Sequence, residues 1–151
     1  MFSDVLLTVD YDRTLTAPDS TIPERNLEAI RYFIANGGAF TVNTGRSLPM
    51  AQAFVDRVPV SAPLLLYNGA VAYDPVTKEF PFVHTIGLDM WETVREVAEL
   101  FPDFTVEVQN LDAHYAFSPN PDWECFSRNN NCAYATARPG QDLGAFLKFT
   151  L

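Results

Sequence analysis

Two aspartates, Asp10 and Asp12, stand two residues apart, directly after an apolar run over residues 5–9. Side chains two apart point the same way for as long as a strand continues, so both carboxylates could meet at one spot. Carboxylates this close repel unless a cation accompanies them, and oxygen ligands suit Mg²⁺. One carboxylate could then attack the phosphorus of a phosphate ester. The other could protonate the leaving alcohol and later activate water.

Two further polar clusters follow later apolar runs, residues 44–47 (Thr-Gly-Arg-Ser) and Asn68-Gly69. A hydroxyl, an unhindered backbone N–H and a helix N-terminus together can bind an anion. Each cluster also has a simpler structural interpretation. The aspartates could be a solvated strand end, Ser47 an ordinary helix cap, and Asn68-Gly69 a plain turn. The coincidence of three clusters at three strand ends favours a shared site.

The elements that position these clusters are those of parallel βαβ units. Short apolar runs predict strands at residues 5–9, 39–43 and 63–67, the first of them buried on both faces. Apolar residues recur at helical spacing over 27–34 and again over 50–58. Because ligands collect at the carboxyl ends of parallel strands, all three clusters are expected at one sheet edge.

The pattern changes after Gly69. Residues 70–73 and 79–85 predict a β-hairpin, and Asp89 is placed to cap a following helix. Residues 104–108 alternate, which predicts a half-exposed strand with Thr105 and Glu107 on its polar side. Residues 114–117 are its expected partner and 146–151 a further strand, whereas 118–140 show no clear period.

Composition excludes several partners. The formal charge is −9, from 19 acidic and 10 basic residues, so neither nucleic acid nor an anionic membrane is an expected partner. No apolar stretch approaches the length of a membrane span, and no leader peptide is expected. Cys125 and Cys132 have no motif spacing, which favours reduced thiols and a cytoplasmic protein. A phosphate ester would need a local cation to approach so acidic a chain.

Three strings carry a resemblance to a known family. DYDRTLT, starting at Asp10, resembles the first motif (D-x-D-x-T) of the haloacid dehalogenase superfamily, and TVNTGRS at 41–47 resembles its second. YNGA at 67–70 resembles the N-G-A of its Cof-like sugar-phosphate phosphatases. The resemblance implies an α/β fold with an incomplete Rossmann-like parallel-sheet core over residues 1–85. Residues 86–151 would be the first part of an α/β cap domain.

The resemblance also implies roles for individual residues. Asp10 would be the nucleophile and a metal ligand, and Asp12 the acid/base, with its backbone carbonyl also on the Mg²⁺. The substrate would be a small phosphorylated metabolite such as a sugar phosphate. Among the phosphate- and substrate-binding residues, Thr14 would orient the Asp12 region, and Thr44 with the Gly45 amide would hold the phosphoryl group. Arg46 and Asn68 would lie near the substrate. Arg13 departs from the family, which usually has glycine there.

Two family elements are not found: a lysine that steadies the phosphate and an acidic pair that usually follows Gly-Asp. The two lysines are Lys78, in the predicted hairpin turn, and Lys148, in a predicted cap strand where it would face solvent; no Gly-Asp occurs. We therefore expect a truncated chain that is inactive alone. Its sheet would have an open edge, through which it could self-associate.

Two other functions fit the same residues. The chain could be a catalytically inactive phosphate-binding or interaction module that keeps the anion site. It could also be a receiver-like domain in which clustered aspartates bind Mg²⁺ and one accepts a phosphoryl group. The TGR and NGA strings argue against the receiver-like fold.

Overall fold

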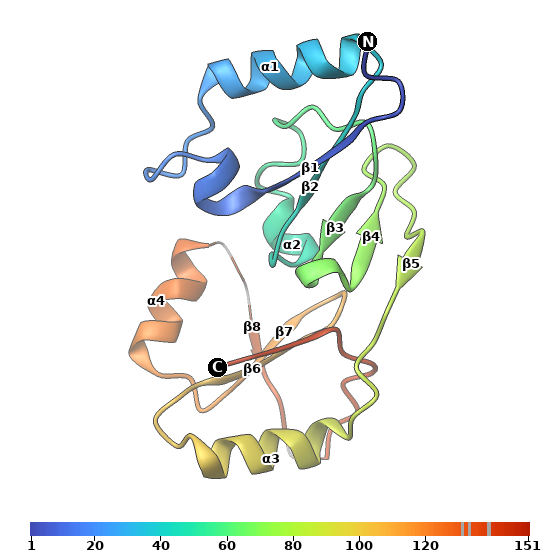
Figure 1. The fold of residues 1–151 in the computed structure, drawn as a ribbon. Helices are drawn as coiled ribbons and strands as arrows, with labels where there is room; N and C mark the ends of the chain where they lie inside the picture. The colour runs from blue at the N-terminus through green and yellow to red at the C-terminus, as the bar shows by residue number, and fades with distance from the viewer. Residues whose placement is uncertain (131, 133, 139) are drawn as a thin grey trace. The chain divides into compact units, whose positions relative to one another are not determined.

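The computed structural model describes residues 1–130, 132, 134–138 and 140–151. It divides the chain into two compact units, Met1–Val83 and His84–Leu151 (Figure 1). The described strands of the first unit are β1 (Leu6–Asp10), β2 (Ala39–Asn43), β3 (Leu64–Leu66), β4 (Val71–Tyr73) and β5 (Phe82–Val83), which form one sheet in that order. Those of the second unit are β6 (Val106–Gln109), β7 (His114–Phe117), β8 (Tyr134–Thr136) and β9 (Lys148–Thr150), in the order β8-β7-β6-β9.

The first three strands run parallel, as the βαβ pattern predicts. Asp10 of β1 lies opposite Asn43 of β2, and Asn43 lies opposite Leu65 of β3. The helix α1 (Glu24–Ala35) connects β1 to β2, and it ends before Gly37, whose φ of +91° suits glycine. The strands β4 and β5 then continue the sheet in antiparallel fashion, which confirms the predicted hairpin.

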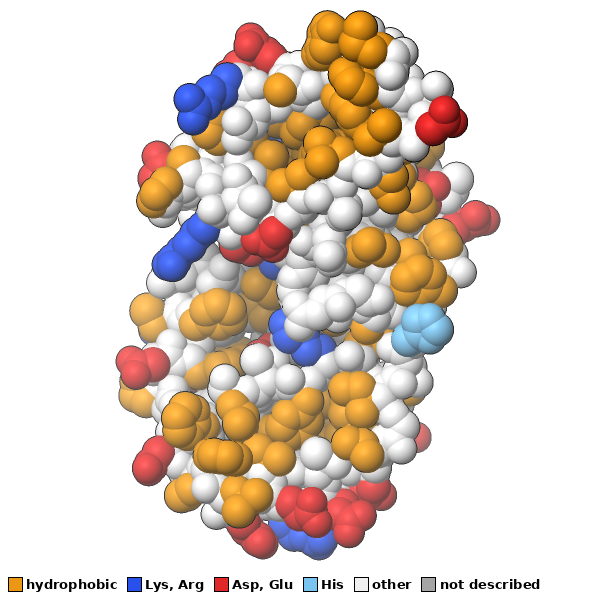
Figure 2. All heavy atoms as spheres, viewed as in Figure 1, with side chains coloured by type: hydrophobic (Ala, Val, Ile, Leu, Met, Phe, Trp, Pro, Cys, Tyr) orange, Lys and Arg blue, Asp and Glu red, His pale blue; other side chains and the backbone are white. Residues whose placement is uncertain are grey.

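The strand β1 corrects one expectation. Its apolar run predicts burial on both faces, but Leu6 is 60% exposed and Leu7 41%. The reason is position in the sheet: among the described residues β1 pairs with β2 alone, whereas β2 has a neighbour on each side and is buried. Figure 2 shows hydrophobic side chains gathered on the face of the first unit where β1 lies.

The helix predicted over 50–58 is also shorter than expected. The helix α2 (Leu48–Ala51) is capped by Ser47, whose Oγ accepts a hydrogen bond from the Met50 N–H. Beyond Ala51 the chain continues as turns, in which the Phe54 N–H donates to the Ala51 carbonyl over three residues. Phe54 and Val58 are nevertheless buried, so the predicted apolar face packs without a regular helix.

In the second unit, α3 (Met90–Leu100) begins where Asp89 predicts, and the Asp89 carboxylate accepts a hydrogen bond from the Glu92 N–H at 2.8 Å. The strand β6 pairs antiparallel with β7, as expected, and with β9. The uninterpreted segment 118–140 contains α4 (Pro121–Asn129), followed by β8, which runs parallel to β7. The side chain of Asn120 caps α4 and a proline opens it, a signal present in the sequence.

The strand β6 contradicts the prediction of a half-exposed strand. Val106 and Val108 on one side pack into a core with α3. Glu107 and Gln109 alternate with them, and both are buried as well, as is Thr105 just before the strand. Alternation shows that the two faces differ in polarity, but it does not show whether the polar face is covered. None of the helices in the described part of the chain has the length and apolar character that a bilayer span needs.

Candidate active site

The Asp10 carboxylate lies at the carboxyl end of β1 and is exposed. Its Oδ2 accepts a hydrogen bond from the Thr14 hydroxyl at 3.2 Å, while no hydrogen bond from the described residues reaches Oδ1. In this structure the Thr14 hydroxyl therefore holds the Asp10 carboxylate. Asp10 presents one oxygen toward solvent from a fixed position, as a nucleophile or a metal ligand requires.

The chain leaves β1 through a tight turn over Tyr11–Leu15. Tyr11 is buried and its ring stacks on Phe54, with centroids 3.9 Å apart. The Thr16 backbone N–H and hydroxyl both donate to the Tyr11 carbonyl, at 3.1 and 3.2 Å. These contacts anchor the ends of the turn and place Asp12 and Arg13 at its exposed tip. The sequence offers a signal for this anchor, an aromatic residue between two aspartates.

Because the strand stops at Asp10, the period-two argument for Asp12 does not apply. The Asp12 carboxylate instead binds Arg46, whose Nε donates to Oδ2 at 2.9 Å and Nη2 to Oδ1 at 2.8 Å. The Arg46 side chain is 16% exposed and that of Asp12 51%. The guanidinium also lies over the Tyr11 ring, with Cζ 5.1 Å from its centroid. Hydrogen bonding to Asp12 raises the pKa of Arg46, so the pair keeps the guanidinium charged.

Thr44 follows β2 directly and is buried. Its hydroxyl oxygen accepts a hydrogen bond from the Arg46 N–H at 3.2 Å, and its carbonyl accepts one from the Asn68 N–H at 3.0 Å. The Tyr67 N–H donates to the Arg46 carbonyl at 3.0 Å. A hydroxyl that accepts one hydrogen bond can still donate another, so Thr44 keeps the capacity to bind a phosphate oxygen.

The structure therefore brings the predicted clusters together at one sheet edge. Asp10 and Asn43 are opposite each other in adjacent parallel strands, which run about 4.8 Å apart. Thr44, Gly45 and Arg46 follow from β2, and Asn68 follows from β3 with a left-handed φ of 58°. The site is thus built from three consecutive loops, each leaving a parallel strand.

The two lysines lie outside the three loops that follow β1, β2 and β3 in the sequence. Lys78 lies in the turn between β4 and β5, with a φ of 64°. Lys148 lies in β9, in the second unit, and is half-buried rather than facing solvent as predicted. Burial lowers the pKa of Lys148, and the charge of Glu107 acts in the opposite direction.

The available donors fit a hard cation. The Asp10 carboxylate and the backbone carbonyl of Asp12 could supply oxygen ligands, and a Mg²⁺ ion would complete its shell with water and substrate oxygens. Both side-chain oxygens of Asp12 are bound to Arg46, so Asp12 would contribute through its carbonyl. A metal held there would offset the negative charge that Asp10 and a phosphate share.

A parallel α/β sheet whose first strand ends in a D-x-D-x-T turn points to a class of phosphoryl-transferring hydrolases. Residues 7–142 match the family model described as haloacid dehalogenase-like hydrolase, and the chain belongs to this family. The resemblance that the three sequence strings carry is thereby confirmed.

Relatives and solved structures agree with this family. The 5-amino-6-(5-phospho-D-ribitylamino)uracil phosphatase YitU of Bacillus subtilis (strain 168) is 25% identical over 111 residues, covering 73% of this chain and 41% of its own length. The crystal structure of a haloacid dehalogenase-like hydrolase from Bacteroides thetaiotaomicron superposes with a TM-score of 0.73 at 18% identity, over 93% of this chain and 55% of the other. The structure of a haloacid dehalogenase subclass IIB sugar phosphatase superposes with a TM-score of 0.71 at 18% identity, over 88% of this chain and 52% of the other.

Substitutions of Arg13 can test the conformation of the turn over Tyr11–Leu15. Its φ of 60° and ψ of 12° lie in the left-handed region, where glycine is favoured and branched side chains are strained. We expect Arg13→Gly to change the free energy of unfolding by less than about 1 kcal/mol. The free energy of unfolding of Arg13→Val should be about 1–2 kcal/mol lower than that of Arg13→Gly. Chemical denaturation of both variants measures this difference.

The matched control is Arg31, an exposed residue inside α1. There the order should reverse, because valine has a slightly better helix propensity than glycine. Equal stability of Arg13→Val and Arg13→Gly would show that the turn in solution does not hold residue 13 left-handed.

Proposed function

We propose that the chain forms the nucleophile-bearing part of a Mg²⁺-dependent phosphatase that acts on small phosphorylated metabolites, such as sugar phosphates. The chain spans 41% of the curated relative and about half of the compared structures, so the proposal concerns the protein to which these residues contribute. The observation that carries it is the Asp10 carboxylate at the end of β1. One of its oxygens accepts a hydrogen bond from Thr14, the other accepts none from the described residues, and the residue is exposed.

The proposed chemistry begins with an attack of the Asp10 carboxylate on phosphorus, which forms an aspartyl phosphate and releases the alcohol. Thr44 and the Gly45 amide would hold the phosphoryl oxygens, and Arg46 and Asn68 would lie beside the substrate. Bound Mg²⁺ would supply neutralising charge for the two anions that must meet. Water would then attack the aspartyl phosphate and restore Asp10.

Asp12 would act as the acid and base, and its pairing with Arg46 sets a condition on that role. Both carboxylate oxygens accept hydrogen bonds from the guanidinium. Delivery of a proton to the leaving alcohol therefore requires one of the two bonds to open. We infer that Arg46 positions Asp12 before substrate binds and then exchanges one of these bonds for a substrate oxygen.

A catalytically inactive phosphate-binding module remains the second candidate. One observation favours it: the Arg46 guanidinium occupies both carboxylate oxygens of Asp12. Phosphate release separates the two functions, because a binding module would take up phosphate without turnover. In either function we place the protein in the cytoplasm, without nucleic acid as a partner.

The role of Asp10 can be tested without turnover. Beryllofluoride mimics a phosphoryl group on a carboxylate, so we expect it to bind in the presence of Mg²⁺ and to give a bound ¹⁹F resonance. Asp10→Asn should abolish that resonance, because an amide neither forms the bond nor ligates the metal well. Asp56→Asn, at an exposed position outside the site, is the matched control and should keep it. A bound resonance that survives Asp10→Asn would exclude Asp10 as the nucleophile.

We further expect the 151-residue chain alone to turn over slowly. The lysine and the acidic pair of the family are not found in this sequence. The loss of one such electrostatic element typically lowers the turnover rate by two to three orders of magnitude, and an ordinary enzyme turns over on the order of 10 times per second. Arg46 does not replace the lysine, because a guanidinium that binds the ground state and the transition state equally does not speed the chemical step. The measurement is phosphate release from a general phosphomonoester by protein of verified mass, with Mg²⁺ or with chelator. Chelator-sensitive turnover within about tenfold of that ordinary rate would contradict the expectation.

The exposed β1 edge is proposed as a surface for self-association. Among the described residues, no strand pairs with the other side of β1, and the backbone there, beside exposed Leu6 and Leu7, forms a template for another strand. Sedimentation velocity over a concentration series should show a dimer that Leu6→Lys weakens. Tyr32→Lys, at an exposed aromatic residue on α1, should leave the dimer intact. A wild-type chain that stays monomeric throughout the series would refute the proposal.

A further inference from the structure

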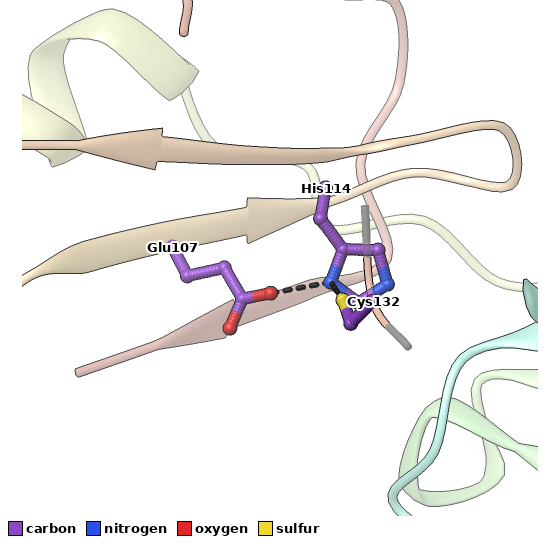
Figure 3. A group of neighbouring side chains, drawn as sticks. All are labelled: Glu107, His114 and Cys132. Carbon is purple, nitrogen blue, oxygen red and sulfur yellow. Dashed lines mark hydrogen bonds and ion pairs between the residues drawn. The ribbon is translucent and has the colours of Figure 1, made fainter. Parts of the chain in front are cut away.

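The second unit contains a buried cluster of three side chains that the proposed phosphatase chemistry does not use. Glu107 of β6, His114 of β7 and Cys132, which follows α4, are 4%, 1% and 2% exposed (Figure 3). His114 lies opposite Gln109 in the antiparallel pair, so it shares a sheet face with Glu107, the residue two before. The Cys132 N–H donates to the carbonyl of Ser127 in α4 at 3.0 Å, which fixes the backbone of Cys132 against this helix.

The three side chains converge on one ring nitrogen. His114 Nδ1 contacts Oε1 of Glu107 and lies 3.0 Å from Sγ of Cys132. As a donor, Nδ1–H satisfies the carboxylate but offers the thiol proton no acceptor. As an acceptor, unprotonated Nδ1 can accept the thiol hydrogen bond, but its lone pair then repels the lone pairs of the Glu107 carboxylate. No single protonation state satisfies both contacts fully, whereas a cation between the three atoms would satisfy all of them.

A nucleophilic triad does not explain the cluster. In such a triad the thiol and the acid contact opposite nitrogens of the imidazole, so that the ring can pass a proton between them. Here both contact Nδ1.

A second, independent observation points to a ligand. Gln109 is 4% exposed, and its Oε1 has no hydrogen-bond partner among the described residues. Gln109 lies directly opposite His114 and on the same face of β6 as Glu107. An unpaired buried carbonyl oxygen is costly unless something completes it. Its place on the sheet face that Glu107 and His114 share makes it the candidate for a fourth donor.

We propose that Glu107, His114 and Cys132 bind a Zn²⁺ ion in the second unit, with Gln109 as the fourth donor. The three ligand atoms lie within 4.8 Å of one another, and all three residues are buried. One sulfur, one nitrogen and one carboxylate oxygen suit Zn²⁺, which prefers tetrahedral sites, and do not suit Mg²⁺. Tetrahedral bonds of about 2.0–2.3 Å to one ion place ligand atoms about 3.3–3.6 Å apart, so the three side chains would move apart to admit the ion. The closed, buried position assigns the ion a structural role, joining β6 and β7 to Cys132.

Lys148 provides the competing explanation. It lies opposite Gln109 across β6 and β9; burial lowers its pKa, and the nearby charge of Glu107 opposes this effect in part. Glu107 could therefore serve only as the counter-ion of Lys148. In that case the cluster would bind no metal, and replacement of Cys132 would have no effect on metal content.

The test uses the full chain, stripped of metal by chelator and dialysis and then titrated with Co²⁺ and Zn²⁺. A Co²⁺–thiolate bond gives a near-ultraviolet charge-transfer band that an all-oxygen site around Asp10 cannot produce, so the result is independent of the phosphatase proposal. We expect the band to saturate at one Co²⁺ per chain and to disappear when Zn²⁺ is added. A tenfold excess of Mg²⁺ should leave it unchanged.

Variants assign the ligands. Cys132→Ser should abolish the band, and Cys125→Ser, which removes the exposed cysteine, should keep it. His114→Gln and Glu107→Gln should each weaken Co²⁺ affinity at least tenfold, a loss expected for a ligand. Circular dichroism verifies that each variant is folded. If Cys132→Ser or His114→Gln does not fold, the Co²⁺ affinity of the folded Glu107→Gln variant decides instead. The absence of a band at one equivalent, or its survival in Cys132→Ser, would overturn the proposal.

Discussion

The parallel pairing of β1 with β2 is the constraint on which the candidate active site depends. Its register runs without a break from Leu6 opposite Ala39 to Asp10 opposite Asn43. The two strands therefore end at the same level, and their loops begin side by side. A shift of one residue would turn Asp10 to the other face of the sheet. Asp12 and Arg46, 34 residues apart in sequence, meet because both loops start from this common edge.

Arg46 then links all three loops. Its side chain binds the Asp12 carboxylate after β1, its N–H donates to the Thr44 hydroxyl after β2, and its carbonyl accepts from Tyr67 after β3. The ion pair is half open to water on the Asp12 side, so it contributes on the order of 1 kcal/mol or less to stability. Its importance is positional, since a bidentate fork fixes both the distance and the plane of the carboxylate.

The sequence predicts this architecture where its signals are local. The bounds of β2 are those predicted, and the residue types of the three clusters are found at the expected strand ends. Contacts between loops, such as that of Asp12 with Arg46, are not predictable because they depend on where two turns lie in space. The stacking of Tyr11 on Phe54 escapes prediction for the same reason. The helix α4 is different: its cap at Asn120 and the following proline are local signals.

Burial is where local reasoning fails most clearly, and it fails in opposite directions in the two units. Leu6 and Leu7 are apolar and exposed, whereas Glu107 and Gln109 are polar and buried. A hydrophobic pattern identifies the two faces of a strand, but the neighbours of that strand decide which face is covered. For β1, an edge position leaves apolar groups in water, at a cost that a pairing strand would remove. For β6, burial removes a carboxylate and an amide from water, and this is stable only if their charges and lone pairs find partners. The polar face of β6 is therefore the part of the second unit in which a bound ion would have the greatest effect on stability.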